Sequence, residues 1–328
     1  MSRGYERHSM PDSGRLQTPS HNPAPAEIER AAAILRGGGL VAFPTETVYG
    51  LGAVATDALA VAAIFALKGR PANNPLIVHV ADVEQARSLC QSWPDSAAKL
   101  AAAFWPGPLS MVLPKVDTIP AIVSGGGDSV ALRCPNHPVA LALIRAAGPL
   151  AAPSANRSGE LSPTSAEHVV RSFGDRSPLI LDAGPCSGGL ESTVIDLRGE
   201  TPVLLRPGLI SKDELERLIG PINLAPASPN SAPASPGLLS RHYAPRTALE
   251  CAATPDELDM LQRLYETAGL KVARYVVPDS LSAAAASLYA DLHRLDAAGF
   301  DRLLVLLPSD TDGWRAIRDR LTRASAEE

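Results

Sequence analysis

The sequence has few aromatic residues and no surplus of positive charge. Phe, Trp and Tyr make up 4% of its 328 residues, and the formal net charge is −5. A chain-wide basic field that holds nucleic acid without sequence preference is therefore excluded, so any RNA contact must be local. The four cysteines lie far apart without CxxC spacing. We expect reduced thiols, not a disulfide framework or a zinc site.

Long apolar runs are also missing. The longest, such as LVAF at 40–43 and LLVLLP at 303–308, are too short to cross a bilayer and suit buried strands. The first residues mix both charge signs with Pro, Ser and Gly and contain no apolar stretch like that of a secretory signal. We therefore expect a soluble, cytoplasmic protein without membrane contact, with a disordered tail over residues 1–26.

Three familiar catalytic signatures are absent from the sequence. It contains no GxxxxGK[ST] phosphate loop, no GxSxG nucleophile elbow and no HExxH zinc motif. If the protein uses ATP, dispersed Lys, Arg and hydroxyl side chains must hold the phosphates.

Helical and strand-like patterns alternate along the chain and predict an α/β fold with a mixed, twisted sheet and flanking helices. Helical spacing covers residues 27–36, 57–68, 95–104, 136–147 and 164–173. Strand-like runs cover 40–44, 75–80, 109–114, 129–133, 179–184, 192–197 and 202–206. The last two runs flank a turn at Gly199, so we expect them to pair antiparallel.

A proline-rich segment divides the chain. Residues 225–236 contain only Ala, Pro, Ser and Asn, a composition typical of a semi-extended linker. We predict a catalytic domain over 27–220, a linker over 221–246 and a small Rossmann-like α/β domain over 247–328. The last domain lacks GxGxxG, so its pattern does not imply nucleotide binding.

The densest polar cluster, PTETVYGLG at 44–52, follows a predicted strand and includes Thr45, Glu46 and Thr47. Ligands commonly bind beyond strand ends, and Gly50 and Gly52 would let a backbone turn approach one closely. A tight turn that caps the next helix is the alternative.

A second cluster, KGRPANNP, holds Lys68, Arg70 and Asn74 in a loop with two prolines. Such cations can converge on a triphosphate, although a solvated basic helix end is the alternative. His79 follows in a predicted strand, where a satisfied core histidine is the alternative. Arg133 ends another strand, and a buried guanidinium there needs a structural or substrate anion.

Further polar residues occur at loop and strand boundaries. Helix capping explains Thr164 in the segment APSANRSGELSPTS, but it does not explain Ser154 and Asn156 so far upstream. Ser129, Ser192 and Arg206 stand at the ends of predicted strands.

Eight of these segments, in order, resemble the signature blocks of the Sua5/YrdC family. They are PTETVYGLG, KGRP, PLIVHV, WPGPLS, SVALRCPNHP, APSANRSGELSPTS, ESTVIDL and LLRPG, within residues 27–210. The linker ending in SPGLLSRHYAP and the small domain after it are similar to the two-domain Sua5 branch.

The resemblance implies a nucleotidyltransferase that makes L-threonylcarbamoyl-AMP from L-threonine, bicarbonate and ATP, with Mg²⁺ accompanying the triphosphate. The carboxylate of N-carboxythreonine would attack the α-phosphate, and pyrophosphate would leave. The product would pass to the machinery that transfers the threonylcarbamoyl group to tRNA. A weak local contact with tRNA is compatible with this role.

The resemblance also implies residue roles. The catalytic tetrad would be Lys68, Arg70, Ser154 and Asn156. Threonine would contact Thr47, His79, Arg133 and Ser192. ATP would contact Arg70, Asn74, Ser129, Asn156, Thr164, Arg206 and, as a lid, Tyr243.

Two alternatives stay open at this point. A related domain in carbamoyl-transferring hydrogenase maturation factors uses similar cations on another carbamate. A double-stranded RNA-binding module could use Lys68, Arg70, Arg133 and Arg206 as a local basic surface, although the low pI opposes it.

Overall fold

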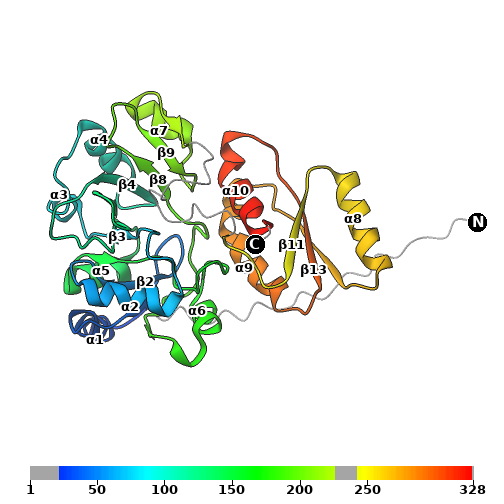
Figure 1. The fold of residues 1–328 in the computed structure, drawn as a ribbon, viewed down its shortest axis with the longest axis horizontal. Helices are drawn as coiled ribbons and strands as arrows, with labels where there is room; N and C mark the ends of the chain where they lie inside the picture. The colour runs from blue at the N-terminus through cyan, green and yellow to red at the C-terminus, as the bar shows by residue number, and fades with distance from the viewer. Residues whose placement is uncertain (1–21, 226–241, 327–328) are drawn as a thin grey trace, which may run out of the picture.

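The protein folds into two α/β domains, as shown by a computed structural model that describes residues 22–225 and 242–326. Ten strands form one sheet in the first domain, and three form a second sheet near the C-terminus. Figure 1 shows the two domains side by side, with α9 (Leu281–Asp296) and α10 (Arg315–Ala324) turned toward the large sheet. The predicted α/β class with a mixed sheet and a small second domain is confirmed.

The large sheet has the strand order β10-β9-β8-β4-β5-β3-β6-β2-β1-β7 and mixes parallel with antiparallel pairs. Its strands are β1 Val41–Phe43, β2 Gly50–Val54, β3 Ile77–His79, β4 Leu109–Pro114, β5 Ser129–Arg133, β6 Leu150–Ala151, β7 Leu179–Ile180, β8 Thr193–Asp196, β9 Val203–Arg206 and β10 Asn223–Leu224. As predicted across Gly199, β8 and β9 pair antiparallel. Parallel pairing of β3 with β5 sets His79 directly beside Arg133.

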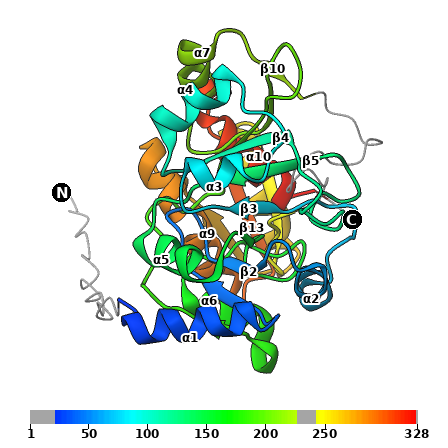
Figure 2. The same ribbon diagram turned by 90° about the vertical axis from the view of Figure 1, so that its left-hand side faces the viewer.

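Helices cover both faces of this sheet (Figure 2). They are α1 Pro25–Arg36, α2 Ala58–Lys68, α3 Val83–Arg87, α4 Asp95–Phe104, α5 Pro138–Ala147, α6 Ala166–Phe173 and α7 Lys212–Ile219. Because strand side chains alternate, Val41 and Phe43 pack with α1 and α5, whereas Ala42 joins a larger core with α2, α4 and α7.

The segment after β1 differs from the prediction. We expected a ligand-approaching turn through Gly50 and Gly52, but both glycines lie in β2. A Cβ at residue 52 would stand 2.8 Å from the ring of Phe43, so this glycine makes room for core packing. Gly50 still lines a cavity, which is described below.

The small domain contains a parallel sheet of order β11-β13-β12, formed by Ala248–Ala252, Arg302–Leu306 and Val272–Tyr275. Leu303 and Val305 face α9 and α10, whereas Leu304 packs with α8 (Pro255–Thr267) on the other side. The alternation of helix and strand that the sequence predicted there is confirmed, and β11 is an additional strand.

Some predicted boundaries lie outside the described residues. This holds for most of the predicted tail, of which only residues 22–26 are described, and for 226–241 of the predicted linker. α1 begins at Pro25, two residues earlier than expected. β10 lies inside the predicted linker range and extends the large sheet through β9. In the described parts of the chain, no helix is long and apolar enough to cross a membrane.

Candidate functional site

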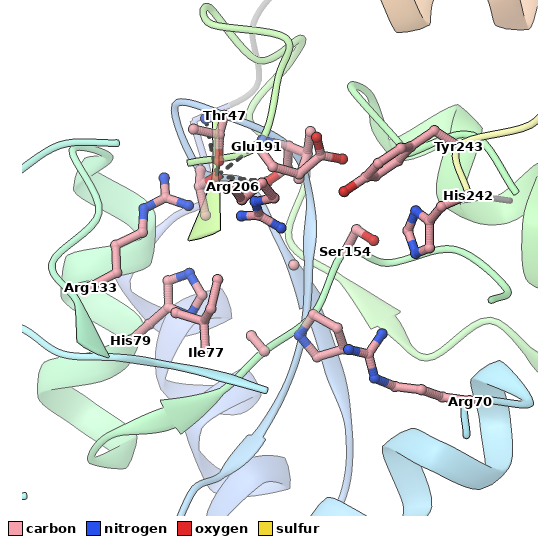
Figure 3. A pocket seen from close by; sticks show the side chains of 15 residues that line it. Thr47, Arg70, Ile77, His79, Arg133, Ser154, Glu191, Arg206, His242 and Tyr243 are labelled. Atoms are coloured by element: carbon pink, nitrogen blue, oxygen red, sulfur yellow. Dashed lines mark hydrogen bonds between the residues drawn. The ribbon is translucent and has the colours of Figure 1, made fainter. Parts of the chain in front are cut away.

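A small cavity lies where several strand ends of the large sheet meet the returning segment of residues 242–244. Its volume is about 40 Å³. Figure 3 shows Arg70, Arg133 and Arg206 around it, with His242 and Tyr243 on the side of the returning segment. The residues that line it are Thr45, Thr47, Val48, Gly50, Arg70, Ile77, His79, Arg133, Ala152, Pro153, Ser154, Glu191, Arg206, His242 and Tyr243.

The loop between β1 and β2 is held in shape by Thr45. Its hydroxyl donates to the Val48 carbonyl at 2.7 Å and lies 2.8 Å from the hydroxyl of Thr47. The backbone amides of Thr47 and Val48 donate back to the Thr45 oxygen. The loop therefore presents the Thr47 side chain to the cavity in one fixed orientation. Tyr49 instead points into the protein and donates to Asp182 and the Gly184 carbonyl.

His79 and Arg133 end two neighbouring parallel strands and reach the same edge of the cavity. Burial, followed by the charge of Arg133, lowers the pKa of His79 to about 3. Its Nδ1 atom is buried and has no hydrogen-bond partner in the described part of the protein. His79 is thus a neutral histidine that faces the cavity, with one ring nitrogen, Nδ1, unpaired among the described residues, in contrast to the fully satisfied core histidine that was the alternative.

Arg133 has a structural anion as its partner. Its Nη2 atom lies 2.8 Å from Glu46 Oε2, although the N–H is not aligned for a hydrogen bond. The Nε atom donates to the Gly107 carbonyl at 3.3 Å. The pair therefore balances the buried guanidinium while one edge of Arg133 remains at the cavity wall.

Arg70 is fixed by the loop that follows α2. Nε donates to the Asn74 carbonyl at 3.0 Å, and Nη2 donates to Asn74 Oδ1 at 2.6 Å and to the Pro75 carbonyl at 2.8 Å. Burial lowers the pKa of Arg70 to about 10, so it stays charged at neutral pH. Asn74 itself lies behind Arg70 and orients it.

Lys68 lies beneath the cavity floor and does not line it. Its ammonium group donates to the backbone carbonyls of Ser154 and Asn156, with 2.6 Å to the former. The Asn156 amide group donates to the Arg157 and Glu160 carbonyls, which closes this loop on itself. Only Ser154 of these three residues reaches the cavity lining.

Arg206 ends β9 and faces the cavity from the opposite side. Its Nε atom donates to the Ser192 carbonyl at 3.1 Å, and Nη2 donates to the Ser192 hydroxyl at 3.1 Å. That hydroxyl also lies 2.8 Å from the hydroxyl of Ser110. Ser192 is thus completely buried behind Arg206 and holds its guanidinium in place.

Two predicted nucleotide contacts lie away from the cavity. Ser129 begins β5, at the opposite end of the strand from Arg133, and lines a separate hollow with Asn73 and Asp128. The Thr164 hydroxyl lies 3.3 Å from His168 Nδ1. These positions make no joint site with the small cavity, and the roles of both residues stay predictions.

Tyr243 and His242 close the cavity. The Tyr243 ring is 1% exposed, and its backbone has φ of 63°, a left-handed conformation that non-glycine residues adopt at a cost. Neighbouring backbone bonds anchor it, from the His242 amide to the Arg323 carbonyl and from the Ala244 amide to the Gly159 carbonyl. Tyr243 therefore lies against the cavity where a lid was expected, and its two neighbours are hydrogen-bonded to different domains.

Glu191 is a cavity residue that the sequence reasoning missed. Ser162 donates to its Oε1 atom, and Tyr289 and Arg320 donate to Oε2. Burial alone would raise the pKa of Glu191, but the charges of Arg320 and Arg206 outweigh it and lower the pKa to about 2. A glutamate between Leu190 and the apolar strand β8 was the available signal of a buried ion pair.

Comparison with known proteins extends over both domains. A family model for the Sua5, YciO and YrdC proteins, described as "Telomere recombination", matches residues 33–208. A second, described as "Threonylcarbamoyl-AMP synthase, C-terminal domain", matches residues 210–326.

Individual relatives are similar along nearly the whole chain. The threonylcarbamoyl-AMP synthase of Bacillus subtilis is 42% identical over 321 residues, which cover 91% of this chain and 93% of the relative. That of Pyrococcus abyssi is 42% identical over 320 residues, with 91% and 94% covered. The solved structure of P. abyssi Sua5 complexed with L-threonine has 42% sequence identity and a TM-score of 0.86, and 92% of this chain and 95% of that chain are covered.

Proposed function

We propose that this chain, which belongs to the Sua5/YrdC family, is a nucleotidyltransferase. The enzyme joins L-threonine, bicarbonate and ATP into L-threonylcarbamoyl-AMP and releases pyrophosphate. The relatives from Bacillus subtilis and Pyrococcus abyssi are threonylcarbamoyl-AMP synthases, and P. abyssi Sua5 was solved with L-threonine. The product serves the threonylcarbamoyl modification of tRNA, and we propose a cytoplasmic location for the protein.

The observation that carries this proposal is the convergence of three buried arginines on one cavity. Arg70, Arg133 and Arg206 are 8%, 4% and 4% exposed, and each is held by backbone or side-chain acceptors. Three cations around one cavity favour anionic occupants, and the proposed reactants carry a triphosphate and carboxylates. The burial also opposes the RNA-binding alternative, because these side chains form no surface that a duplex could touch.

The proposed chemistry needs no protein nucleophile. Threonine's amine adds to bicarbonate with loss of water, and a carboxylate oxygen of the resulting carbamate attacks the α-phosphorus. The bond from that phosphorus to the bridging oxygen breaks, and pyrophosphate leaves with its electron pair. In such a reaction the protein contributes position and charge.

Each wall of the cavity suits one part of this task. Thr47, His79 and Arg133 lie together and can bind threonine through a hydroxyl, a neutral imidazole and a cation. Arg70 and Arg206 face them and can bind phosphate oxygens. Lys68 contributes indirectly in this geometry, because it fixes the loop that carries Ser154.

Mg²⁺ enters the proposal with the triphosphate. It prefers oxygen ligands and commonly keeps several waters while it binds phosphates. The hydroxyls of Thr47 and Ser154 fit such a role, whereas the Glu191 carboxylate already accepts three hydrogen bonds. Among residues 22–225 and 242–326, no three His, Cys, Asp or Glu side chains gather to hold a metal. The ion neutralises phosphate charge when it is bound.

Tyr243 lines one side of the cavity of about 40 Å³. In the proposed cycle the segment around Tyr243 moves away as ATP enters, and its return excludes water from a mixed anhydride that hydrolyses readily.

The test is pyrophosphate release by the purified protein with ATP and Mg²⁺, with threonine and bicarbonate omitted in turn. We expect release only when both are present, together with a product of the mass of threonylcarbamoyl-AMP. Release that does not depend on threonine would refute the proposal.

A further inference from the structure

Arg320 of the C-terminal domain reaches the cavity wall of the first domain. It lies on α10 and is 1% exposed. Its Nε atom donates to Glu191 Oε2 at 2.8 Å, and Nη2 donates to the Pro207 carbonyl at 3.0 Å. Asp319 accepts from the remaining terminal nitrogen. Every edge of this guanidinium is therefore used, and two of its partners belong to the other domain.

Glu191 creates an electrostatic problem in the cavity. The three arginines there favour anionic occupants, but an unpaired carboxylate in the same wall would repel them. Arg320 is the cation that bonds directly to this carboxylate, while Ser162 and Tyr289 satisfy its other lone pairs. The wall is thus electrostatically more favourable for an anion while the C-terminal domain is docked.

The same guanidinium also contacts the lid. Its central carbon lies 4.9 Å from the centre of the Tyr243 ring, and Tyr289 packs on that ring with centroids 5.8 Å apart. Both contacts pack against the ring of a residue whose backbone has the left-handed φ of 63°. A cation over an aromatic face stabilises the arrangement, and more so where both are buried.

We propose that Arg320 is a positioning residue that makes the cavity dependent on docking of the C-terminal domain. It neutralises Glu191 in the cavity wall and holds Tyr243 over the cavity, so one side chain couples anion binding to closure. This inference rests on the proposed function for its substrate, because the anion is the triphosphate of ATP.

A purely structural role explains the arrangement less well. Replacing a buried ion pair by apolar side chains often leaves stability unchanged or raises it, so stability alone does not call for the pair. The ion pair lies between the cavity wall and the lid, where it can affect the binding of an anion. Among the described residues, the charged and titratable groups that face Glu191 are Arg206, His242, Tyr243, Tyr289 and Arg320.

Four variants of the full chain test the proposal. Arg320→Met removes the cation, Arg320→Lys keeps a charge without the planar group, and Arg320→Met/Glu191→Gln removes both charges. Arg318→Met is the matched control, because Arg318 lies on the same helix and its bonds to described residues go to Pro308 and Asp310 of its own domain. Two assays are used: pyrophosphate release, which gives KM for ATP and kcat, and hydrogen exchange without substrate, which gives the exchange rate of the Ala244 amide.

The two effects should separate across these variants. Arg320→Met should raise KM for ATP at least tenfold and speed exchange at Ala244 at least tenfold. In the double variant, KM for ATP should return most of the way to the wild-type value, since no unpaired carboxylate remains. Exchange at Ala244 should stay fast. Arg320→Lys should keep KM for ATP within threefold of the wild type, while the Ala244 amide should still exchange faster than in the wild type. Arg318→Met should match the wild type in both.

Three results would overturn the inference. The first is that Arg320→Met matches Arg318→Met in both measurements. The second is that the double variant has a KM for ATP as high as that of Arg320→Met. The third is that Arg320→Lys has a KM for ATP as high as that of Arg320→Met. Hydrogen exchange needs no turnover, so closure can be judged even if the wild type releases no pyrophosphate. In that case the proposed function fails while the coupling of Arg320 to Tyr243 is still tested.

Discussion

The ammonium group of Lys68 donates a hydrogen bond to the backbone carbonyl of Ser154 at 2.6 Å, across 86 residues of sequence. The predicted role of Lys68 was a direct grip on phosphate. Its burial and its two carbonyl acceptors instead assign it, in the closed geometry, to the loop that delivers Ser154 to the cavity.

Replacing Lys68 should therefore disturb a loop as well as a charge. Lys68→Met leaves two buried carbonyls without their donor, which costs about 1–3 kcal/mol of stability for each. We expect a lower unfolding midpoint in urea together with strongly reduced pyrophosphate release. Lys99→Met, at an exposed position on α4, is the control and should change neither. Full stability combined with lost activity would instead favour direct phosphate contact.

Arg70 offers a sharper test of phosphate binding. A charge-assisted hydrogen bond is worth about 1.5–3 kcal/mol, so Arg70→Met should lower kcat/KM for ATP by roughly tenfold to 100-fold. Arg198→Met removes an arginine from an exposed cluster with Asp128 and Asp196 and should leave kcat/KM unchanged. Equal values for the two variants would remove Arg70 from the site.

The buried neutral imidazole of His79 makes stability depend on pH. Its folded pKa of about 3 lies below the usual value of 6.5, so between these values the unfolded chain binds a proton that the folded chain does not. The free energy of unfolding should fall as pH decreases through that window, with His79 contributing about 1.4 kcal/mol per pH unit. His79→Asn should have a shallower slope by that amount in urea unfolding between pH 4 and 7. Parallel slopes would show that His79 is charged in the fold.

Tyr243→Phe should separate stability from activity. The Tyr243 hydroxyl is buried and lacks a hydrogen-bond partner among the residues that the structure describes. Its removal should raise the free energy of unfolding by about 1 kcal/mol. Turnover should fall, because that hydroxyl faces the cavity (Figure 3). Tyr275→Phe, in a strand remote from the cavity, should leave turnover intact. Full turnover in Tyr243→Phe would show that the lid needs the Tyr243 ring but not its hydroxyl.

Regular patterns made much of the fold predictable. The bounds of β4, β5 and α4 coincide with the expected ranges, because their apolar residues repeat with clear strand or helix periods. Strand β2 was missed because Gly50 and Gly52 are typical of a turn, and only the position of the Phe43 ring explains them. The two-residue strand β6 is too short for any period to show, and β7 occupies only the first two residues of the predicted run 179–184.

Site residues were predictable where a polar side chain stands at the end of a buried strand, as for His79, Arg133 and Arg206. Their arrangement was not, since the sequence does not show that Arg133 meets Glu46 or that Ser192 lies behind Arg206. Glu191 and Arg320 are separated by 129 residues, and only docking of the two domains brings them together. Contacts between residues so far apart in the sequence do not affect the local spacing of apolar and polar residues, so that spacing does not predict them.

The anchoring of Tyr243 on both sides has a kinetic consequence. Ala244 is bonded to Gly159 and His242 to Arg323, so any movement of the covering segment away from the cavity breaks backbone contacts with both domains. On the proposed function, the residence time of the finished adenylate is then set by the rate of this movement and not by its equilibrium affinity. An acceptor that loosened either anchor would shorten that time, and so receive the product before water does.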